Sequence, residues 1–239
     1  MRRHIGALLH LCLDDYHQGK WAEVLELPEE GLTLCSKSGY TICTWFFQYT
    51  KGLVTGSRGD TETAHALADA MTIWAAPRGI REAVHCAQEV HALADIADGD
   101  FDAAFGRVNA ISPAGSFTPY VAHAVWVFFE LVEAAIRTDR RAEAAAHVRA
   151  LRETNVAGLS PRLALLAGGA EALVAEDDAE AARLFARALA TPGVDRWPFA
   201  LARVRLAQGE RLRRSRALSD SKVPLTAALK SFQQLDSSA

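Results

Sequence analysis

Four junctions occur at intervals of forty residues along the first two thirds of the chain: Gly19-Lys20-Trp21, Gly59-Asp60-Thr61, Gly99-Asp100-Phe101 and Asp139-Arg140-Arg141. An Ala-rich amphipathic segment follows each of them. A fixed period of this length is typical of architectures in which one supersecondary unit stacks on the next. The junctions therefore decide the fold class before any single residue does.

The residues after each junction keep one register. Counting from the last residue of each junction, the first register position comes three residues later and holds a small or β-branched residue. The second register position comes four residues after the first. The third comes three residues after the second and holds an apolar or small residue. These three positions are occupied by Val24, Ala64, Ala104 and Ala144, then by Pro28, Ala68, Val108 and Val148, then by Gly31, Met71, Ile111 and Leu151. The pattern is typical of the second helix of a helix-turn-helix unit. We expect an all-α fold, a right-handed α-solenoid of about six helix pairs, forming a single domain over residues 1–239.

The chain departs from this regularity at Pro28 and in the spacing after Arg141, where the next junctions come near Ala179 and Lys222. A helix from about Trp21 to Ser36 contains Pro28, which removes one intrahelical hydrogen bond and is expected to kink or split the helix. A loop over residues 112–119 precedes a helix expected to begin near Tyr120. In the last pair, a helix over residues 223–235 is expected to carry the register on Leu225, Leu229 and Phe232.

Composition and charge exclude several classes of protein. Half of the residues are apolar, and the formal net charge is −3 with acidic and basic residues interspersed, which argues against a surface that coats nucleic acid. No stretch approaches the ~20 apolar residues of a membrane span. Asp14 and Asp15 interrupt the apolar N-terminal stretch, so it does not fit a signal peptide. We expect a soluble, cytoplasmic protein with no membrane partner.

The four cysteines, Cys12, Cys35, Cys43 and Cys86, lie in apolar helical patterns and form no C-x-x-C pair. They are typical of reduced, buried thiols in a cytosolic protein.

Motifs for covalent or nucleotide chemistry are missing from the sequence. Gly19-Lys20 lacks the upstream glycine of a P-loop, and neither a G-x-S-x-G nor an H-E-x-x-H motif occurs. In the stretch His85-Cys86-Ala87-Gln88-Glu89-Val90-His91, His85 and Glu89 share a helix face, but His91 points elsewhere. We expect no enzymatic activity, no catalytic residue, no cofactor and no metal.

Arginines cluster near the C-terminal end, and five of them form a candidate basic contact patch: Arg205, Arg211, Arg213, Arg214 and Arg216. Such a patch suits a phosphate backbone or an acidic neighbouring domain. The alternative is a solvated helix face whose aliphatic stems cover apolar neighbours. Aromatic residues do not interleave with Arg211–Arg216, as single-strand binding would require, so we expect no direct nucleic-acid contact.

One segment matches a known repeat pattern. Ala181, Phe185 and Ala188 fit the tetratricopeptide pattern A-x-x-x-F-x-x-A, and in such folds the first helix of each pair lines a concave groove. By the forty-residue register, the candidate groove for a small polar ligand or a peptide is lined by Phe46, Tyr49, Glu89, Trp126, Phe129 and Glu133. The alternative is that these aromatic rings only pack between helices.

Most of the chain also resembles one protein family. The stretches SPRLALL (160–166), DRWPFALARV (195–204), GERLRR (209–214) and LTAALKSF (225–232) are similar to the C-terminal helical-repeat region of large ATP-binding LuxR-type transcriptional regulators. Trp74–Gly79 and Ala142–Val148 look like the same family.

The resemblance implies a sensor and protein-interaction module. Its partners would be the ATPase domain and the DNA-binding helix-turn-helix domain of such a regulator, and its ligand a small-molecule inducer or another protein. Neither domain occurs in this sequence, so we expect either a piece of a longer regulator or a shortened family member. A freestanding tetratricopeptide-like scaffold that binds peptide segments of other proteins is the alternative, and a homodimer stays open.

Overall fold

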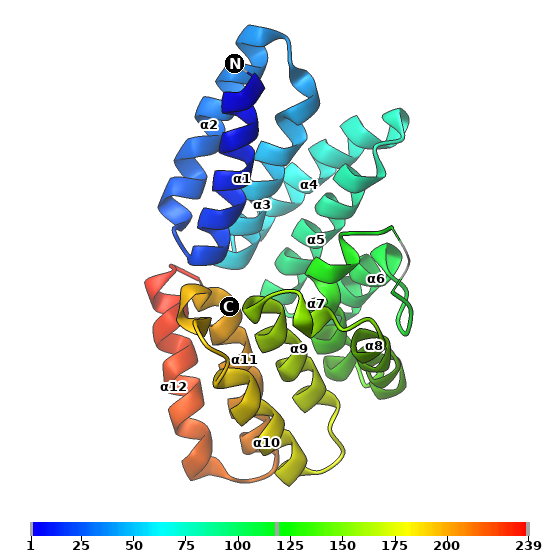
Figure 1. Ribbon diagram of the computed structural model, residues 1–239, viewed down its shortest axis with the longest axis vertical. Coiled ribbons are helices and arrows are strands. Elements are labelled where there is room, and N and C mark those ends of the chain that lie inside the picture. The colour runs from blue at the N-terminus through cyan, green and yellow to red at the C-terminus, as the bar shows by residue number, and fades with distance from the viewer. Residues whose placement is uncertain (1, 118–119, 238–239) are drawn as a thin grey trace. The chain divides into compact units, whose positions relative to one another are not determined.

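A computed structural model describes residues 2–117 and 120–237 of the chain. Within these residues the protein forms twelve α-helices and four short 3₁₀ turns, and no strand (Figure 1). The prediction of an all-α fold is confirmed. The helices are α1 (Arg2–Gln18), α2 (Trp21–Ser38), α3 (Thr44–Arg58), α4 (Thr61–Ala75), α5 (Arg81–Ala97), α6 (Phe101–Ile111), α7 (Ala124–Arg137), α8 (Arg141–Glu153), α9 (Pro161–Val174), α10 (Asp178–Leu189), α11 (Pro198–Arg214) and α12 (Leu218–Gln234).

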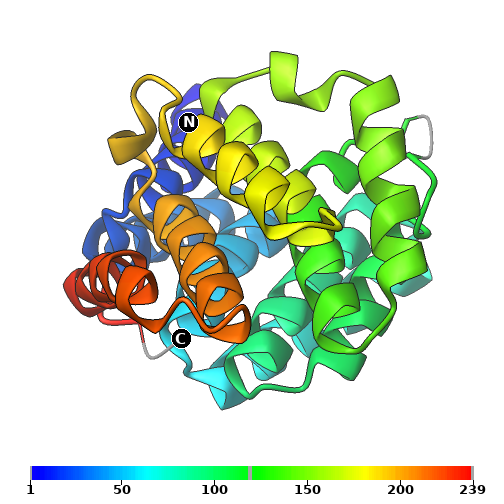
Figure 2. The ribbon, with the colours of Figure 1, turned by 90° about the horizontal axis from the view of Figure 1, so that it is seen from below.

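The helices belong to two compact units. The first contains the described residues up to Asp100 together with Ser237, and the second contains Phe101–Asp236. In each unit every helix packs against the next one along the chain, as α11 and α12 do in Figure 2. Alternate helices also touch: α1 with α3 and α3 with α5 in the first unit, and α7 with α9 and α9 with α11 in the second.

Left-handed residues end the helices at a regular interval. Glycines with positive φ recur every twenty residues, at Gly19, Gly39, Gly59, Gly79 and Gly99, and Asp139 takes the same conformation in the later junction. The left-handed conformation lets the last helical turn close its backbone hydrogen bonds, and glycine adopts it without a steric penalty. For example, the N–H of Gly59 donates to the carbonyl of Gly56 at 3.1 Å. Each forty-residue period thus consists of two twenty-residue halves in the first unit.

The predicted register is buried. Val24, Ala64, Ala104 and Ala144 are fully buried, and the positions that follow them are buried as well. Small side chains at these positions allow the helices of a pair to approach closely. Two helix N-termini are capped by side chains: Asp60 accepts a hydrogen bond from the N–H of Thr63, and Ser160 accepts one from the N–H of Leu163.

The expectations for α2 and α7 need correction. α2 runs without a break through Pro28, whose buried ring lies among the core residues of the helix, so the helix is not split there. α7 begins at Ala124 and not near Tyr120, which has a φ of 69° and cannot continue a right-handed helix. Pro119, at the end of the predicted loop, lies outside the described residues.

The register of α12 is shifted from the expected one. The helix begins at Leu218 and passes through Pro224, so that Pro224 and Ala228 are buried with Phe232. Leu229, which we expected inside, is 56% exposed. The buried stripe contains Ser221, Pro224, Ala228 and Phe232, so it lies one residue before the expected positions Leu225 and Leu229.

The four cysteines form no disulfide with one another. Cys12, Cys35 and Cys86 are buried and Cys43 is half-buried. Burial, together with the nearby charge of Asp15, raises the pKa of the Cys12 thiol to about 11, so the group stays protonated at neutral pH. Among the helices of residues 2–117 and 120–237, none combines the length and hydropathy that a membrane span requires.

Candidate functional site

The predicted groove residues fall into two sets of three, one in each unit. In the first unit, the Tyr49 hydroxyl on α3 donates a hydrogen bond to Glu89 Oε2 on α5 at 2.5 Å. Both side chains are buried, and the ring of Phe46 meets the Tyr49 ring edge-on at 5.8 Å. Burial raises the pKa of Tyr49 well above its usual value, and the charge of Glu89 adds to the effect. Tyr49 is therefore a permanent donor that holds the carboxylate.

In the second unit, a buried arginine joins the predicted residues. Arg203 on α11 donates to Glu133 Oε2 at 2.5 Å and also to Glu130, and all three side chains are buried. The guanidinium lies 4.8 Å from the centre of the Phe129 ring. Burial opposes the charge of Arg203, but the attraction of Glu130 and Glu133 outweighs it and raises the pKa of the guanidinium. Glu133 and Phe129 thus belong to an internal ionic cluster.

Trp126 differs from its neighbours because it is half-buried. The guanidinium of Arg162, from α9, lies 5.3 Å from the centre of its ring, a distance typical of a cation–π contact. Of the six predicted groove residues, Phe46 and Trp126 are the two that keep partial exposure.

The predicted basic patch is only partly free in this structure. Arg211 donates through Nε to Asp178 at 3.0 Å and through Nη1 to the carbonyl of Ala175 at 2.9 Å, so it covers the C-terminal end of α9. Partial desolvation of the guanidinium lowers the pKa of Arg214; the charge of Glu210 opposes this shift, and the charges of nearby arginines add to it. Arg213, Arg214 and Arg216 are exposed and Arg205 is half-buried.

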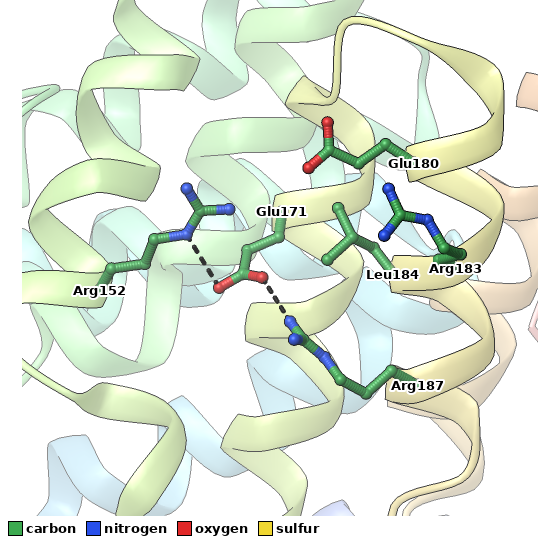
Figure 3. Close-up of a pocket in the computed structure, with 6 residues that line it drawn as sticks. All are labelled: Arg152, Glu171, Glu180, Arg183, Leu184 and Arg187. Atoms are coloured by element: carbon green, nitrogen blue, oxygen red, sulfur yellow. Dashed lines mark hydrogen bonds and ion pairs between the residues drawn. The ribbon is translucent and has the colours of Figure 1, made fainter.

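A pocket of about 520 Å³ in the second unit was not expected from the sequence (Figure 3). It lies among α8, α9 and α10 and is lined by Arg152, Glu171, Glu180, Arg183, Leu184 and Arg187. Three arginines and two glutamates give the lining one net positive charge. An anionic group is therefore the ligand that the pocket would favour.

Glu171 organises this pocket. Its Oε1 accepts from Arg152 Nε at 3.1 Å and its Oε2 accepts from Arg187 Nη2 at 2.7 Å, as Figure 3 shows. The Glu171 side chain is only 16% exposed, whereas those of Arg152 and Arg187 are mostly exposed. Arg183 forms no ion pair with any of the described residues. The pocket therefore offers one guanidinium without an ion-pair partner beside two that the half-buried Glu171 carboxylate holds in place.

A second, smaller hollow of about 160 Å³ adjoins the first. It shares Arg152 and Glu171 with the pocket and is otherwise lined by Leu151, Asn155, Ala157 and Ala167. The ion pair of Arg152 and Glu171 thus lines both hollows, one largely charged and one more apolar. A ligand with an anionic group and a short apolar group would match the two together.

The sequence did contain a signal for this pocket. Glu180, Arg183, Leu184 and Arg187 follow the spacing of three, four and seven residues that places side chains on one helix face. The spacing does not say which other helix this face meets. The sequence therefore could not show that Arg152 on α8 and Glu171 on α9 line the same pocket.

The three comparisons with known proteins bear on family and fold. Comparison with protein-family models, with curated proteins and with solved structures finds no match to this chain.

Proposed function

We propose that the chain is the sensor and protein-interaction module of a LuxR-type transcriptional regulator. In this proposal the helices form a right-handed α-solenoid of six tetratricopeptide-like pairs, without catalytic activity or a cofactor of its own. The module binds an inducer or a partner segment and passes the signal to an ATPase domain and a DNA-binding domain. The resemblance of the sequence and the packing of alternate helices in both units support it.

The observation that carries the ligand-binding part is the pocket around Glu171. Guanidinium groups in a fixed arrangement recognise carboxylates and phosphates with two parallel hydrogen bonds. Arg183 has no ion-pair partner among the described residues, and Arg187 is oriented by Glu171. We therefore assign the pocket to an anionic ligand, either a small acid or an acidic side chain of a peptide.

The position of the pocket suits signal transmission. Arg152 lies on α8, at the end of one predicted helix pair, whereas Glu171 and Arg183 lie on α9 and α10, which form the next pair. A ligand that contacts Arg152 and Arg183 together would tie consecutive pairs to one another. It can change the shape of the solenoid only if it binds two arrangements with different affinity.

A thermal-shift screen of small carboxylates and phosphates and of short acidic peptides tests the proposal. A ligand present at about 100 times its dissociation constant should raise the melting temperature by about 5–10 °C. The variant Arg183→Gln should lose most of that shift, because it removes the free guanidinium but no internal ion pair. Arg149→Gln, at an exposed arginine on α8 outside the pocket lining, is the matched control and should keep the shift.

Two results would overturn the assignment. A ligand whose shift is the same in wild type and in Arg183→Gln binds elsewhere on the chain. If no compound in the screen raises the melting temperature, an anionic ligand is excluded. The module would then have a purely structural role in docking other domains.

The second candidate is a freestanding scaffold that binds peptide segments of other proteins. The exposed arginines of the pocket favour it, since an acidic peptide reaches such a surface without entering an enclosed cavity. Stabilisation by acidic peptides but not by small acids would support the scaffold. Stabilisation by a small acid that also alters binding to an ATPase domain would support the regulator.

A further inference from the structure

Two histidine–aspartate pairs face each other across α4 and α5 in the first unit. His65 and Asp69 are four residues apart on α4, and His91 and Asp95 are four residues apart on α5, so each pair shares one helix face. The pairs are crossed: His65 Nε2 lies 3.4 Å from Asp95 Oδ1, and His91 Nε2 lies 3.3 Å from Asp69 Oδ1. α4 and α5 pack directly against one another.

The two imidazole rings meet through their Nδ1 atoms, which are 2.7 Å apart. A carboxylate beside each Nε2 favours a proton on that nitrogen, so that in a neutral ring the Nδ1 carries a lone pair. Two lone pairs at this distance repel one another. The contact at 2.7 Å fits a hydrogen bond in which one ring takes the Nδ1–H tautomer and donates to the other. If both rings keep their proton on Nε2, the two lone pairs can instead bind a metal ion.

The surroundings match those of metal-bound histidines. A histidine that binds a metal through one ring nitrogen usually donates its other N–H to a carboxylate, which fixes the tautomer and the ring orientation. Both rings have such a carboxylate here. The site also has a route to solvent, since the His65 side chain is 32% exposed and that of Asp69 is 68% exposed, whereas His91 and Asp95 are buried.

We propose that His65 and His91 form a two-histidine binding site for a divalent transition-metal ion such as Zn²⁺, with Asp95 and Asp69 orienting the rings. Two nitrogens bound to one tetrahedral Zn²⁺ at about 2.0–2.1 Å are about 3.3 Å apart, so the rings must separate by about 0.6 Å. The partly exposed His65 ring can supply this movement. Water or an exogenous ligand completes the coordination on the solvent side.

A metal ion bound by both histidines would cross-link α4 and α5, which no disulfide joins. The two histidines belong to the first unit, and the pocket around Glu171 belongs to the second. The test of the metal site is therefore independent of the test of the proposed function.

Zn²⁺ titration of the full chain by isothermal calorimetry tests the proposal. We expect one saturable site per chain, with binding at least ten-fold weaker in His65→Asn and in His91→Asn. His10→Asn, at an exposed histidine on α1, is the matched control and should bind as wild type does. Asp95→Asn keeps both nitrogens but removes an orienting carboxylate, and should weaken binding about 10–100-fold.

Nitrogen-detected spectra of the imidazole rings add a readout that does not depend on folding stability. Zn²⁺ should shift the Nδ1 resonances of two histidines and leave their Nε2 atoms protonated. His91 is buried, so His91→Asn can fail to fold. In that case His65→Asn tests the proposal, because the His65 side chain reaches solvent. Undiminished Zn²⁺ binding in His65→Asn, or no binding by the wild-type chain, would overturn the proposal and leave a hydrogen bond between the two rings.

Discussion

The imidazole ring of His147 stacks on the ring of Phe117, with centroids 5.0 Å apart and the histidine fully buried. Its Nδ1 accepts a hydrogen bond from the backbone N–H of Gly115 at 3.3 Å. Its Nε2 is buried and has no hydrogen-bond partner among the described residues. Burial in these surroundings lowers the pKa of His147 from 6.5 to about 4, because a charged ring would lose its hydration.

This pKa predicts how stability depends on pH. Between pH 6.5 and 4 the unfolded chain binds a proton at His147 that the folded chain does not, so the free energy of unfolding falls as the pH falls. Above pH 6.5 the contribution is constant. At about 1.4 kcal/mol per pKa unit, His147 accounts for a loss of up to about 3 kcal/mol across the window.

Urea unfolding at several pH values measures this loss. His147→Asn keeps an acceptor near the Gly115 N–H but does not titrate, so its stability should fall less steeply below pH 6.5 than that of the wild type. His10→Asn replaces an exposed histidine and should leave the slope unchanged. Equal slopes in wild type and His147→Asn would show that the ring does not stay neutral in the folded state.

Removing Arg203 should destabilise the second unit strongly. Arg203→Leu leaves Glu130 and Glu133 buried without their counter-ion, which typically costs about 3–5 kcal/mol. Arg205→Leu, two residues along the same helix and half-buried, should cost far less. Urea unfolding followed by tryptophan fluorescence measures both.

A compensating variant separates charge from packing in this cluster. Combining Arg203→Leu with Glu130→Gln and Glu133→Gln removes the unpaired charges, and most of the lost stability should return. If the triple variant is as unstable as Arg203→Leu, the guanidinium contributes mainly through its packing over Phe129.

The sequence predicted the regular part of the fold well. Periodicity identifies which face of a helix is buried, and Ala64, Ala104 and Ala144 are buried as the register requires. The prediction of helix breaks was wrong where it relied on a single proline. Pro28 and Pro224 both lie inside continuous helices, because packing of the buried proline ring compensates for the missing hydrogen bond.

The candidate sites depend on contacts between helices, which periodicity cannot supply. The sequence places Glu89 and Tyr49 at related positions of the repeat, and the structure joins them by a hydrogen bond. His65 and His91 occupy unrelated positions, so their close approach could not be inferred. The partner of Glu133 was also missed, because Arg203 lies seventy residues further along the chain.

Two helical glycines of the second unit should respond in opposite directions to the same substitution. A Cβ at Gly168 on α9 would lie 2.7 Å from the Cβ and 3.3 Å from the Cα of Ala188 on α10, so Gly168→Ala forces the two helices apart. Overpacking costs typically about 1–3 kcal/mol, of which about 1 kcal/mol is offset by the better helix propensity of alanine.

Gly106→Ala on α6 is the matched control, because nothing lies within 4 Å of its added Cβ. It should raise the melting temperature by about 2–4 °C through helix propensity alone. Stabilisation by Gly168→Ala as well would mean that α9 and α10 approach less closely than the structure shows.

The forty-residue register itself is tested by two leucine substitutions on α8. Ala144 is fully buried at the small-residue position of the repeat, whereas Ala142 lies two residues earlier on the exposed face. Ala144→Leu should overpack the contact with α7 and lower the free energy of unfolding by about 1–3 kcal/mol. Ala142→Leu adds the same atoms in solvent and should change it by less than about 0.5 kcal/mol. Similar small effects from both would show that α8 does not present Ala144 to its partner helix, and the register that organises the chain would have to be redrawn.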